Sequence, residues 1–423
     1  MKRLLFVVVC LAGLACERSG GMRIIALKAP SAGAPQSADP ALAVDLGSGD
    51  LLLAWAEGDG HVWTLYHTRS GDGGTRWLPP VRVAGGAGSP EEVHPHGESS
   101  PRLVAGPGQR IALVWPNSIT VPGRKWPAAM LRFSRSVDGG VTWSIPLTLN
   151  DDTTGALASH QFHGAAWVGD SGLAVAWLDE RGVMAPTPSG VDGGAEQSAE
   201  PDATIYLASS PDFGRSWTPN RIGWTAACPC CRVSLARNAD GQAVAAWRQH
   251  FPGNIRDVVT AKVGNPPSKP ERVHPDNWSY AGCPHTGPAL ATAGDGAAHV
   301  VWYNGKAGSQ GMYYARSGQP GGRAEAVELV SGARVGPSHP AVVALSDGGA
   351  LAAYDVTASG ERRIGVARLR ADGSLAGRVW VDDSDGGKYP QLAVLGDTLA
   401  VVSWTGAKGD SPQLRMARIS LFR

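Results

Sequence analysis

Histidine and cysteine residues stand in closely spaced groups in the middle of this 423-residue chain. The groups include His94-x-His96, His160-x-x-His163 and Cys283-x-His285, and the stretch Cys228–Cys231 reads Cys-Pro-Cys-Cys. Imidazole and thiolate groups at such spacing are typical ligands of zinc or copper. The cysteines beyond residue 16 are also even in number, which favours disulfides if the chain is exported. A metal site and disulfides are therefore both open for these residues.

The composition predicts many short strands joined by turns. The chain has 56 Gly, 31 Pro and 15 Trp, and only 18% of its residues are charged. Gly and Pro are the residues that turns require, and aromatic residues are common in strands. The net charge of +1 gives no reason to expect binding to nucleic acid or to a charged membrane surface.

One motif occurs seven times after residue 39, with a period of 50 to 70 residues. Each copy has a first strand led by a small residue or proline, a turn, and an apolar second strand that ends in an aromatic residue. These aromatic residues are Trp55, Trp115, Trp177, Trp247, Trp302, Tyr354 and Trp404. A third strand follows every copy and a fourth follows the first six. The strand 23–29, before the first copy, could supply the fourth strand of the last and so remove exposed sheet edges.

Three turns in the first three copies share one pattern. Ser70–Trp77, Ser136–Trp143 and Ser210–Trp217 each have Ser, Asp, Gly and Trp at their first, third, fifth and eighth positions. This pattern resembles the Asp-box of the sialidase-like (BNR-repeat) β-propeller superfamily. The resemblance implies an all-β propeller of four-stranded antiparallel blades, in which Asp72, Asp138 and Asp212 are structural. We favour seven blades, with a six-bladed propeller and a second domain as the alternative.

In such a blade, the residues just before each first strand gather around one mouth of the central channel. Those segments hold most of the histidines and all the cysteines beyond residue 16. The candidate zinc or copper ligands there are His94, His96, His160, His163, Cys228, Cys230, Cys231, Cys283, His285 and His339. Disulfides between the cysteines, and histidines that only line a wet channel, are the alternatives. The Cys-Pro-Cys-Cys stretch also resembles that of a subgroup of exported bacterial sialidase-like proteins.

The resemblance further implies hydrolysis of a terminal sialic acid. Such enzymes hold the substrate carboxylate with arginines and use a tyrosine nucleophile paired with Glu, and an Asp acid/base. The candidates here are Arg102, Arg232, Arg256, Asp179 and Tyr303, with Tyr389 as another possible nucleophile. The Arg-Ile-Pro motif that opens sialidase domains is absent from the N-terminal strands. For each arginine we favour the alternative of a solvated loop charge or half of a salt bridge.

The first residues predict export. Lys2 and Arg3 precede the apolar run 4–14, which is too short to span a bilayer. The following Leu-Ala-Cys16 resembles a bacterial lipoprotein cleavage site, so we predict a signal peptide over 1–16 with Cys16 lipidated. An ordinary secretory signal is the alternative. We expect a tether over 17–39, the propeller over 40–423, and a periplasmic or cell-surface location on a bacterial membrane.

The first residues predict export, and the resemblance to the sialidase-like superfamily implies a propeller that binds or acts on a glycan at the channel mouth. A metal-binding or redox propeller that uses the His/Cys cluster is the alternative, and a non-catalytic interaction scaffold is a further one. The expected partner is a glycan or small molecule, and the expected cofactor, if any, is copper or zinc. A Gly/Pro/Ala-rich insertion at 182–202 is expected to be a loop over the mouth, and Trp126 could stack on a sugar.

Overall fold

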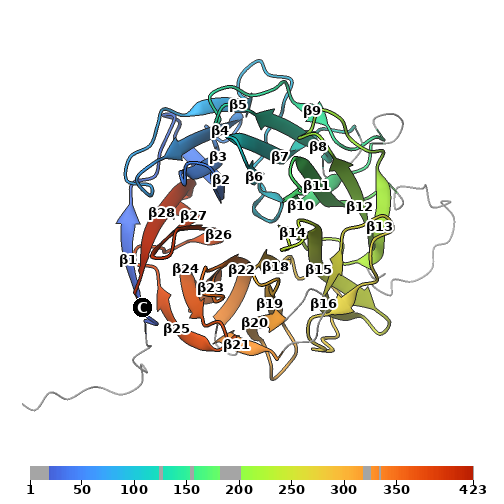
Figure 1. Ribbon diagram of the computed structural model, residues 1–423, viewed down its shortest axis with the longest axis vertical. Coiled ribbons are helices and arrows are strands. Elements are labelled where there is room, and N and C mark those ends of the chain that lie inside the picture. The colour runs from blue at the N-terminus through green and yellow to red at the C-terminus, as the bar shows by residue number, and fades with distance from the viewer. Residues whose placement is uncertain are drawn as a thin grey trace, which may run out of the picture.

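The computed structural model describes residues 19–122, 127–152, 157–181, 202–317, 325–332 and 335–422. The predicted signal segment with Cys16, Trp126, and the insertion as far as residue 201 lie outside the described residues. Within them there are 28 strands and one short 3-10 helix, arranged as a ring (Figure 1). The prediction of an all-β propeller of four-stranded antiparallel sheets is confirmed. No helix among the described residues is long and apolar enough to cross a membrane.

Five of the six sheets contain four antiparallel strands each. The first two sheets are β2 (Gln36–Val44), β3 (Leu51–Gly58), β4 (Trp63–Ser70) and β5 (Val81–Gly85), then β6 (Arg102–Gly106), β7 (Arg110–Ile119), β8 (Ala128–Ser136) and β9 (Leu147–Thr148). The next two are β18 (Ala289–Thr292), β19 (Ala298–Asn304), β20 (Gly311–Ser317) and β21 (Val327–Ser331), then β22 (Val335–Ala344), β23 (Ala350–Ala358), β24 (Glu361–Leu369) and β25 (Leu375–Trp380).

The remaining strands between β9 and β18 form one eight-stranded sheet. It contains β10 (His160–Val168), β11 (Gly172–Asp179), β12 (Ala203–Ser210), β13 (Arg221–Ala227), β14 (Ser234–Arg237), β15 (Ala243–Phe251), β16 (Ile255–Lys262) and β17 (Glu271–Arg272). A single residue pair, Ala227 with Gln249, joins β13 to β15. We interpret this sheet as two neighbouring blades in contact at one point, and seven blades remains a prediction.

The first described strand and the last close the ring. The fifth four-stranded sheet contains β26 (Lys388–Leu395), β27 (Leu399–Lys408) and β28 (Ser411–Leu421). Its outer strand is β1 (Met22–Leu27), which pairs antiparallel with β28 from Met22–Leu421 to Leu27–Met416. This confirms closure by the N-terminal strand, which ends two residues earlier than predicted. The first propeller strand, β2, also begins at Gln36, before the expected boundary at residue 40.

The apolar core lies between neighbouring sheets. Each sheet is covered on both faces, so its second strand must be apolar throughout; β3 and β11 are buried at every position. The aromatic residue near the end of each second strand is buried, and several indoles donate to a polar group nearby. Trp55 bonds Glu57, Trp177 bonds Asp179 and Trp247 bonds Gln249, all at 2.7–2.8 Å.

The three turns of the repeated Ser-x-Asp pattern have one hydrogen-bond arrangement. In the first, the Ser70 hydroxyl donates to Asp72 at 2.9 Å and accepts from the Gly74 amide, and Asp72 accepts from the Arg76 amide. The turns at Asp138 and Asp212 repeat these bonds. The tryptophan of each turn packs between sheets, as predicted for an Asp-box: the Trp217 ring lies 5.0 Å from that of Phe133, in the preceding sheet.

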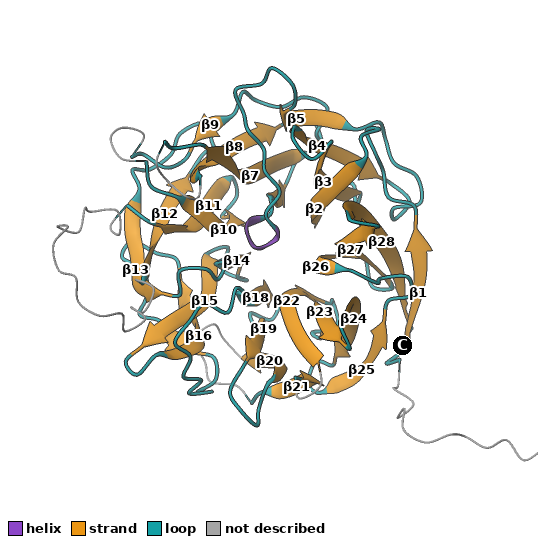
Figure 2. Ribbon diagram, turned by 180° about the vertical axis from the view of Figure 1, so that it is seen from behind, coloured by secondary structure: helices purple, strands orange, loops and turns teal. Residues whose placement is uncertain are grey.

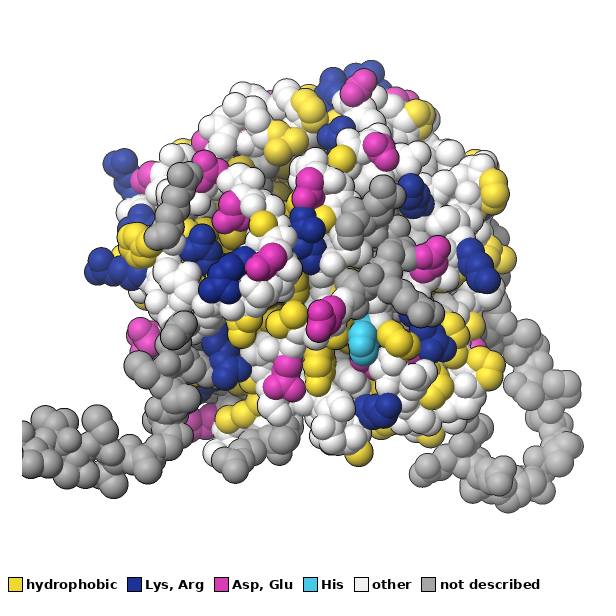
Figure 3. Space-filling model, turned by 60° about the horizontal axis from the view of Figure 1, so that its bottom comes forward, with side chains coloured by type: hydrophobic (Ala, Val, Ile, Leu, Met, Phe, Trp, Pro, Cys, Tyr) yellow, Lys and Arg dark blue, Asp and Glu magenta, His cyan; other side chains and the backbone are white. Residues whose placement is uncertain are grey.

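Acidic and basic side chains are interspersed on the face shown in Figure 3. No large area of a single charge sign is visible there among the described residues. This distribution agrees with the net charge of +1.

Candidate functional site

A loop between β5 and β6 reaches the axis of the ring. Its 3-10 helix η1 (Gly97–Ser99) lies near the centre in Figure 2. Gly97 packs against the ring of Tyr389, since a Cβ at Gly97 would lie only 2.0 Å from a ring carbon. The Ser99 hydroxyl accepts a hydrogen bond from the Phe162 amide at 2.8 Å. Contacts to two different sheets therefore hold η1 over the channel.

Four first strands carry a β-bulge at their mouth end. The pairing with the second strand shifts register at Asp39, Phe162, His339 and Tyr389, and each of these residues has a positive φ between 49° and 56°. Residues other than glycine rarely adopt a positive φ without a structural reason. The bulges turn these residues out of the strand alternation, and Asp39, His339 and Tyr389 join the polar groups at the channel mouth.

Glu98 of η1 points into a polar cluster on the ring axis and is only 2% exposed. Its Oε1 lies 3.6 Å from Nε2 of His339 and 3.9 Å from Nη1 of Arg232. Its Oε2 accepts from the Gly287 amide at 3.4 Å. The His339 ring lies 4.1 Å from the Tyr389 ring, and its Nδ1 bonds Asp355. One carboxylate thus joins residues from three different sheets.

Arg102 and Arg232, both predicted site residues, lie beside Glu98. Arg102 donates to the His163 carbonyl at 3.2 Å and to Ser100 at 3.1 Å, and Arg232 donates to the Pro340 carbonyl. One terminal nitrogen of each guanidinium is buried without a hydrogen-bond partner. Both side chains line a cavity of about 130 Å³ on the ring axis. Burial and the nearby Arg232 lower the pKa of Arg102 to about 9.

Two further ionisable groups of this cluster have raised pKa values. Burial raises the pKa of Asp39 to about 6, against the lowering effects of the His96 amide and Arg102. The Asp39 carboxylate accepts from that amide at 2.6 Å. Burial and the neighbouring Glu98 raise the pKa of Tyr389 to about 12. At neutral pH, Tyr389 therefore keeps its proton, and Asp39 titrates slightly below neutrality.

The other three predicted catalytic residues lie outside this cluster. Asp179 ends β11, where it binds His160 and Arg181. Arg256 lies on β16 and donates to the Tyr280 carbonyl at 2.9 Å. Tyr303 lies on β19, with its ring edge-on to that of Trp278. Of the predicted catalytic set, Arg102 and Arg232 line one cavity, and the Arg248 guanidinium donates to the carbonyls of both Arg256 and Tyr303 at 2.8 Å.

The ten predicted metal ligands also separate into groups. Nε2 of His163 donates to the Val114 carbonyl at 3.0 Å, and burial lowers its pKa to about 3. His160 lies between Asp179 and Asp152, at 3.0 and 3.1 Å. His339 belongs to the Glu98 cluster. The remaining seven residues are three histidines around a pocket and the four cysteines.

His94, His96 and His285 line a pocket at the channel mouth. We call it the mouth pocket; it has a volume of about 560 Å³. Its other lining residues are Pro116, Ser118, Pro127, Ala128, Ala129 and Gln161. The three histidines are exposed, and burial of part of the His96 ring lowers its pKa. His94 and His96 come from the loop that carries Glu98, so the pocket and the buried cluster share one segment.

The cysteines gather between β13 and β14 and before β18. Cys230 and Cys283 form a disulfide, and the Sγ atoms of Cys228 and Cys231 lie 3.5 Å apart. The sulfurs of Cys228, Cys230 and Cys283 are within 4.8 Å of one another. With Cys230 and Cys283 bonded to each other, only Cys228 and Cys231 remain as thiols, too few for a tetrahedral zinc or copper site. The disulfide alternative therefore fits this arrangement better than the metal.

The other described group of three ligand-type side chains is Asp152, His160 and Asp179. Its carboxylates are already bonded by Arg181, at 2.9 Å to Asp179 and 3.3 Å to Asp152, and Asp179 also accepts from the Trp177 indole. These contacts make an ion-pair network rather than a vacant ligand set. The network joins the start of β10 and the end of β11 to the loop that contains Asp152.

Asp39 and Glu98 were not among the predicted site residues. Asp39, His339 and Tyr389 each precede a proline that opens a repeat. Proline favours extended backbone in the residue before it, so this spacing did not predict the positive φ. Nor did it say which side chains meet across the axis.

Neither a protein-family model nor a curated protein sequence matches this chain. Among solved structures, a protein of unknown function from Dyadobacter fermentans is similar to it, with 15% identity and a TM-score of 0.52 over 95% of this chain and 100% of the other. An α-L-arabinanase from Penicillium chrysogenum has 16% identity and a TM-score of 0.48, covering 91% and 94% of the two chains. A Hadza microbial sialidase has 12% identity and a TM-score of 0.49, covering 90% and 65%.

At such identities the likeness concerns the fold alone. Together with the strand order, it defines the class of this protein as a β-propeller. What its site does must be argued from its own residues.

Proposed function

We propose that this protein recognises a glycan in the mouth pocket. The observation that carries the proposal is the arrangement of His94, His96, His285 and Gln161 around a hollow of about 560 Å³ with proline and alanine in its wall. A neutral imidazole offers one donor and one acceptor, and an amide offers both, which suits the hydroxyl groups of a sugar. The aliphatic side chains suit its C–H faces, and the volume falls in the range of small-ligand sites.

Hydrolysis is a second candidate, favoured by the raised pKa of Asp39 of about 6. A carboxyl group that is partly protonated near neutral pH can donate a proton to a leaving oxygen. Tyr389 next to Glu98, with Arg102 and Arg232, would complete a constellation like that of a sialidase. Glu98 already occupies the space between Arg232 and His339, however, and a substrate carboxylate would compete with it. Recognition therefore leads over sialidase activity.

A glycan array followed by calorimetry tests this proposal. We expect the double variant His94→Ala/His285→Ala to weaken binding of the best glycan roughly tenfold, because two hydrogen-bonding groups of about 0.5–1.5 kcal/mol each are removed. His61→Ala, an exposed histidine outside the pocket lining, serves as the matched control. Glycans that bind no better than buffer, or equally well to the double variant, would contradict the proposal.

The same glycans also separate binding from turnover. Released sugar that disappears in Asp39→Asn, with the dissociation constant unchanged, would establish hydrolysis as the further step. Binding without released sugar would leave recognition as the whole function.

We also propose that the protein is exported and anchored to a bacterial membrane through a lipid on Cys16. The disulfide supports an oxidising compartment, where such bonds persist. We expect labelled palmitate to be incorporated by the full chain in a bacterial host and lost in Cys16→Ala, which should then be released in soluble form. Label retained by Cys16→Ala would contradict the anchor.

A further inference from the structure

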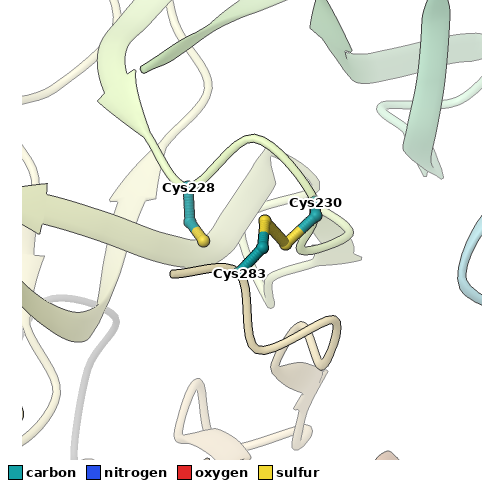
Figure 4. Close-up of side chains that lie close together, drawn as sticks. All are labelled: Cys228, Cys230 and Cys283. Atoms are coloured by element: carbon teal, nitrogen blue, oxygen red, sulfur yellow. A yellow bond between two sulfur atoms is a disulfide. The ribbon is translucent and has the colours of Figure 1, made fainter. Parts of the chain in front are cut away.

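The cysteine group places a thiol directly beside a disulfide. Cys228, Cys230 and Cys231 lie in the loop that follows β13, and the disulfide joins this loop to Cys283 before β18. Figure 4 shows the sulfur of Cys228 pointing toward the Cys230–Cys283 bond. Cys228 Sγ is within 4.8 Å of both bonded sulfurs and 3.5 Å from Cys231 Sγ. Small side-chain movements are therefore enough to bring each sulfur to its neighbour.

The surroundings of Cys228 favour its thiolate. Arg256 of β16 donates to Cys228 Sγ at 3.2 Å, and the Cys231 thiol donates to the same atom. These bonds and the charge of Arg248 on β15 lower the pKa of Cys228 to about 6, although burial acts in the opposite direction. Burial, the neighbouring Cys228 and the charge of Glu98 raise the pKa of Cys231 instead. One cysteine of the Cys-x-x-Cys pair is thus ready to attack while the other keeps its proton.

We propose that the four cysteines form an intramolecular thiol–disulfide relay. In the first step, the Cys228 thiolate attacks Cys283 Sγ, the Cys228–Cys283 bond forms, and the electron pair of the broken bond leaves on Cys230. In the second step, Cys231 attacks Cys228 Sγ, the Cys228–Cys231 bond forms, and Cys283 leaves as a thiolate that takes up the proton of Cys231. The disulfide moves from one pair to the other without an external oxidant.

The relay transfers the reducing equivalents of the buried Cys228/Cys231 dithiol to a pair that includes a more exposed cysteine. Cys228, Cys230 and Cys231 are at most 4% exposed, whereas Cys283 is only partly buried. After exchange, the two reducing equivalents reside on Cys230 and Cys283, and Cys283 can react with a small thiol or disulfide in solution. Exchange also cuts the covalent link between the segments before β14 and β18. The propeller therefore carries a redox activity that is independent of the proposed glycan recognition.

Disulfide mapping of the exported chain tests the relay. The protein is incubated without added thiol or oxidant and with oxygen excluded, quenched with acid, alkylated and digested without reduction. We expect wild type to show both the Cys230–Cys283 and the Cys228–Cys231 bond. Cys231→Ser should stop after the first step and accumulate Cys228–Cys283. Cys228→Ser, a matched substitution three residues away, should show only Cys230–Cys283.

A second readout separates exchange from misfolding. In folded wild type, the exchange rate should rise between pH 5 and 7 and then level off, and Arg256→Gln should slow it at least tenfold at pH 7. Wild type that keeps only the Cys230–Cys283 bond for hours at pH 8 would overturn the relay. So would one equivalent of zinc or copper bound to a chain in which all four cysteines are alkylated after chelation.

Discussion

Lowering the pH from 7 to about 4.5 is expected to destabilise the folded chain by roughly 4–8 kcal/mol. Burial is the main reason that the pKa of His67 falls to about 4, that of His163 to about 3 and that of His299 to about 4. In the unfolded chain these imidazoles have their ordinary pKa near 6.5, so between the two values the unfolded chain binds more protons. Their contribution is therefore full above pH 6.5 and is lost as the pH falls toward 4, at roughly 1.4 kcal/mol per unit for each histidine.

Asp39 acts in the opposite direction. Because burial raises its pKa to about 6, Asp39 takes up a proton in the folded chain between pH 6 and 4.5. This protonation increases the free energy of unfolding by about 2 kcal/mol. The three histidines outweigh it. A typical domain has a free energy of unfolding of only about 5–15 kcal/mol, so the chain should be close to unfolding at pH 4.5.

Denaturant unfolding followed by tryptophan fluorescence at several pH values measures this effect. His163→Gln, which keeps a donor for the Val114 carbonyl, should flatten the pH dependence by roughly 2–3 kcal/mol between pH 7 and 4.5. The exposed His61→Gln should leave the profile unchanged. Equal unfolding free energies at pH 7 and 4.5 in wild type would contradict the assignment of buried neutral histidines.

Removing the closing strand is expected to have the second large effect. Deletion of residues 19–29 uncovers the edge of β28 and removes Met22 and Leu27 from the core between β1 and its neighbours. Burial of one such side chain stabilises by about 1.5–3 kcal/mol. With the lost strand pairing, the free energy of unfolding should fall by on the order of 5 kcal/mol. The exposed edge should also cause association between chains, because it offers unpaired backbone groups.

The position of the chain ends supplies the control. The Phe422 amide donates to the Gly21 carbonyl at 2.7 Å, so the end of β28 and the start of β1 are adjacent. Adding residues 19–29 back after Phe422 through a short Asn-Gly turn should restore both the unfolding free energy and the wild-type association state, measured by light scattering. A truncated chain that is as stable as wild type would show that the ring does not need this strand.

The fold was predictable because its signals are local and repeated. A second strand covered on both faces must be apolar along its length, so Trp55 and its six counterparts could be found by their period alone. The turns at Asp72, Asp138 and Asp212 have hydrogen bonds within a few residues of one another, which a short stretch of sequence can specify. The last repeat lacks a fourth strand, and one strand precedes the first repeat. These two facts were enough to predict that the N-terminal strand closes the ring.

The composition of the site was predictable only in part. Of the predicted site residues, Arg102, Arg232 and His339 lie near the axis, and the four cysteines lie together. Asp179, Arg256 and Tyr303 were predicted as catalytic residues because they lie near strand ends. Many polar residues at strand ends only form structural hydrogen bonds with neighbouring groups. The number of cysteines allowed a disulfide but left the pairing open, since several pairings share the same count.

Local sequence patterns therefore specify the repeat, the turns and the set of side chains available at one mouth of the ring. Which of them meet was decided by the tertiary structure. The bulges at Asp39, His339 and Tyr389, and the contact of Gly97 with the Tyr389 ring, bring Glu98 among groups more than 100 residues away in the chain. Such contacts depend on the angle between whole sheets and on a backbone conformation that local sequence permits but does not require. The packing of the loop after β13 against the segment before β18 likewise brings the Cys230–Cys283 disulfide within reach of Cys228.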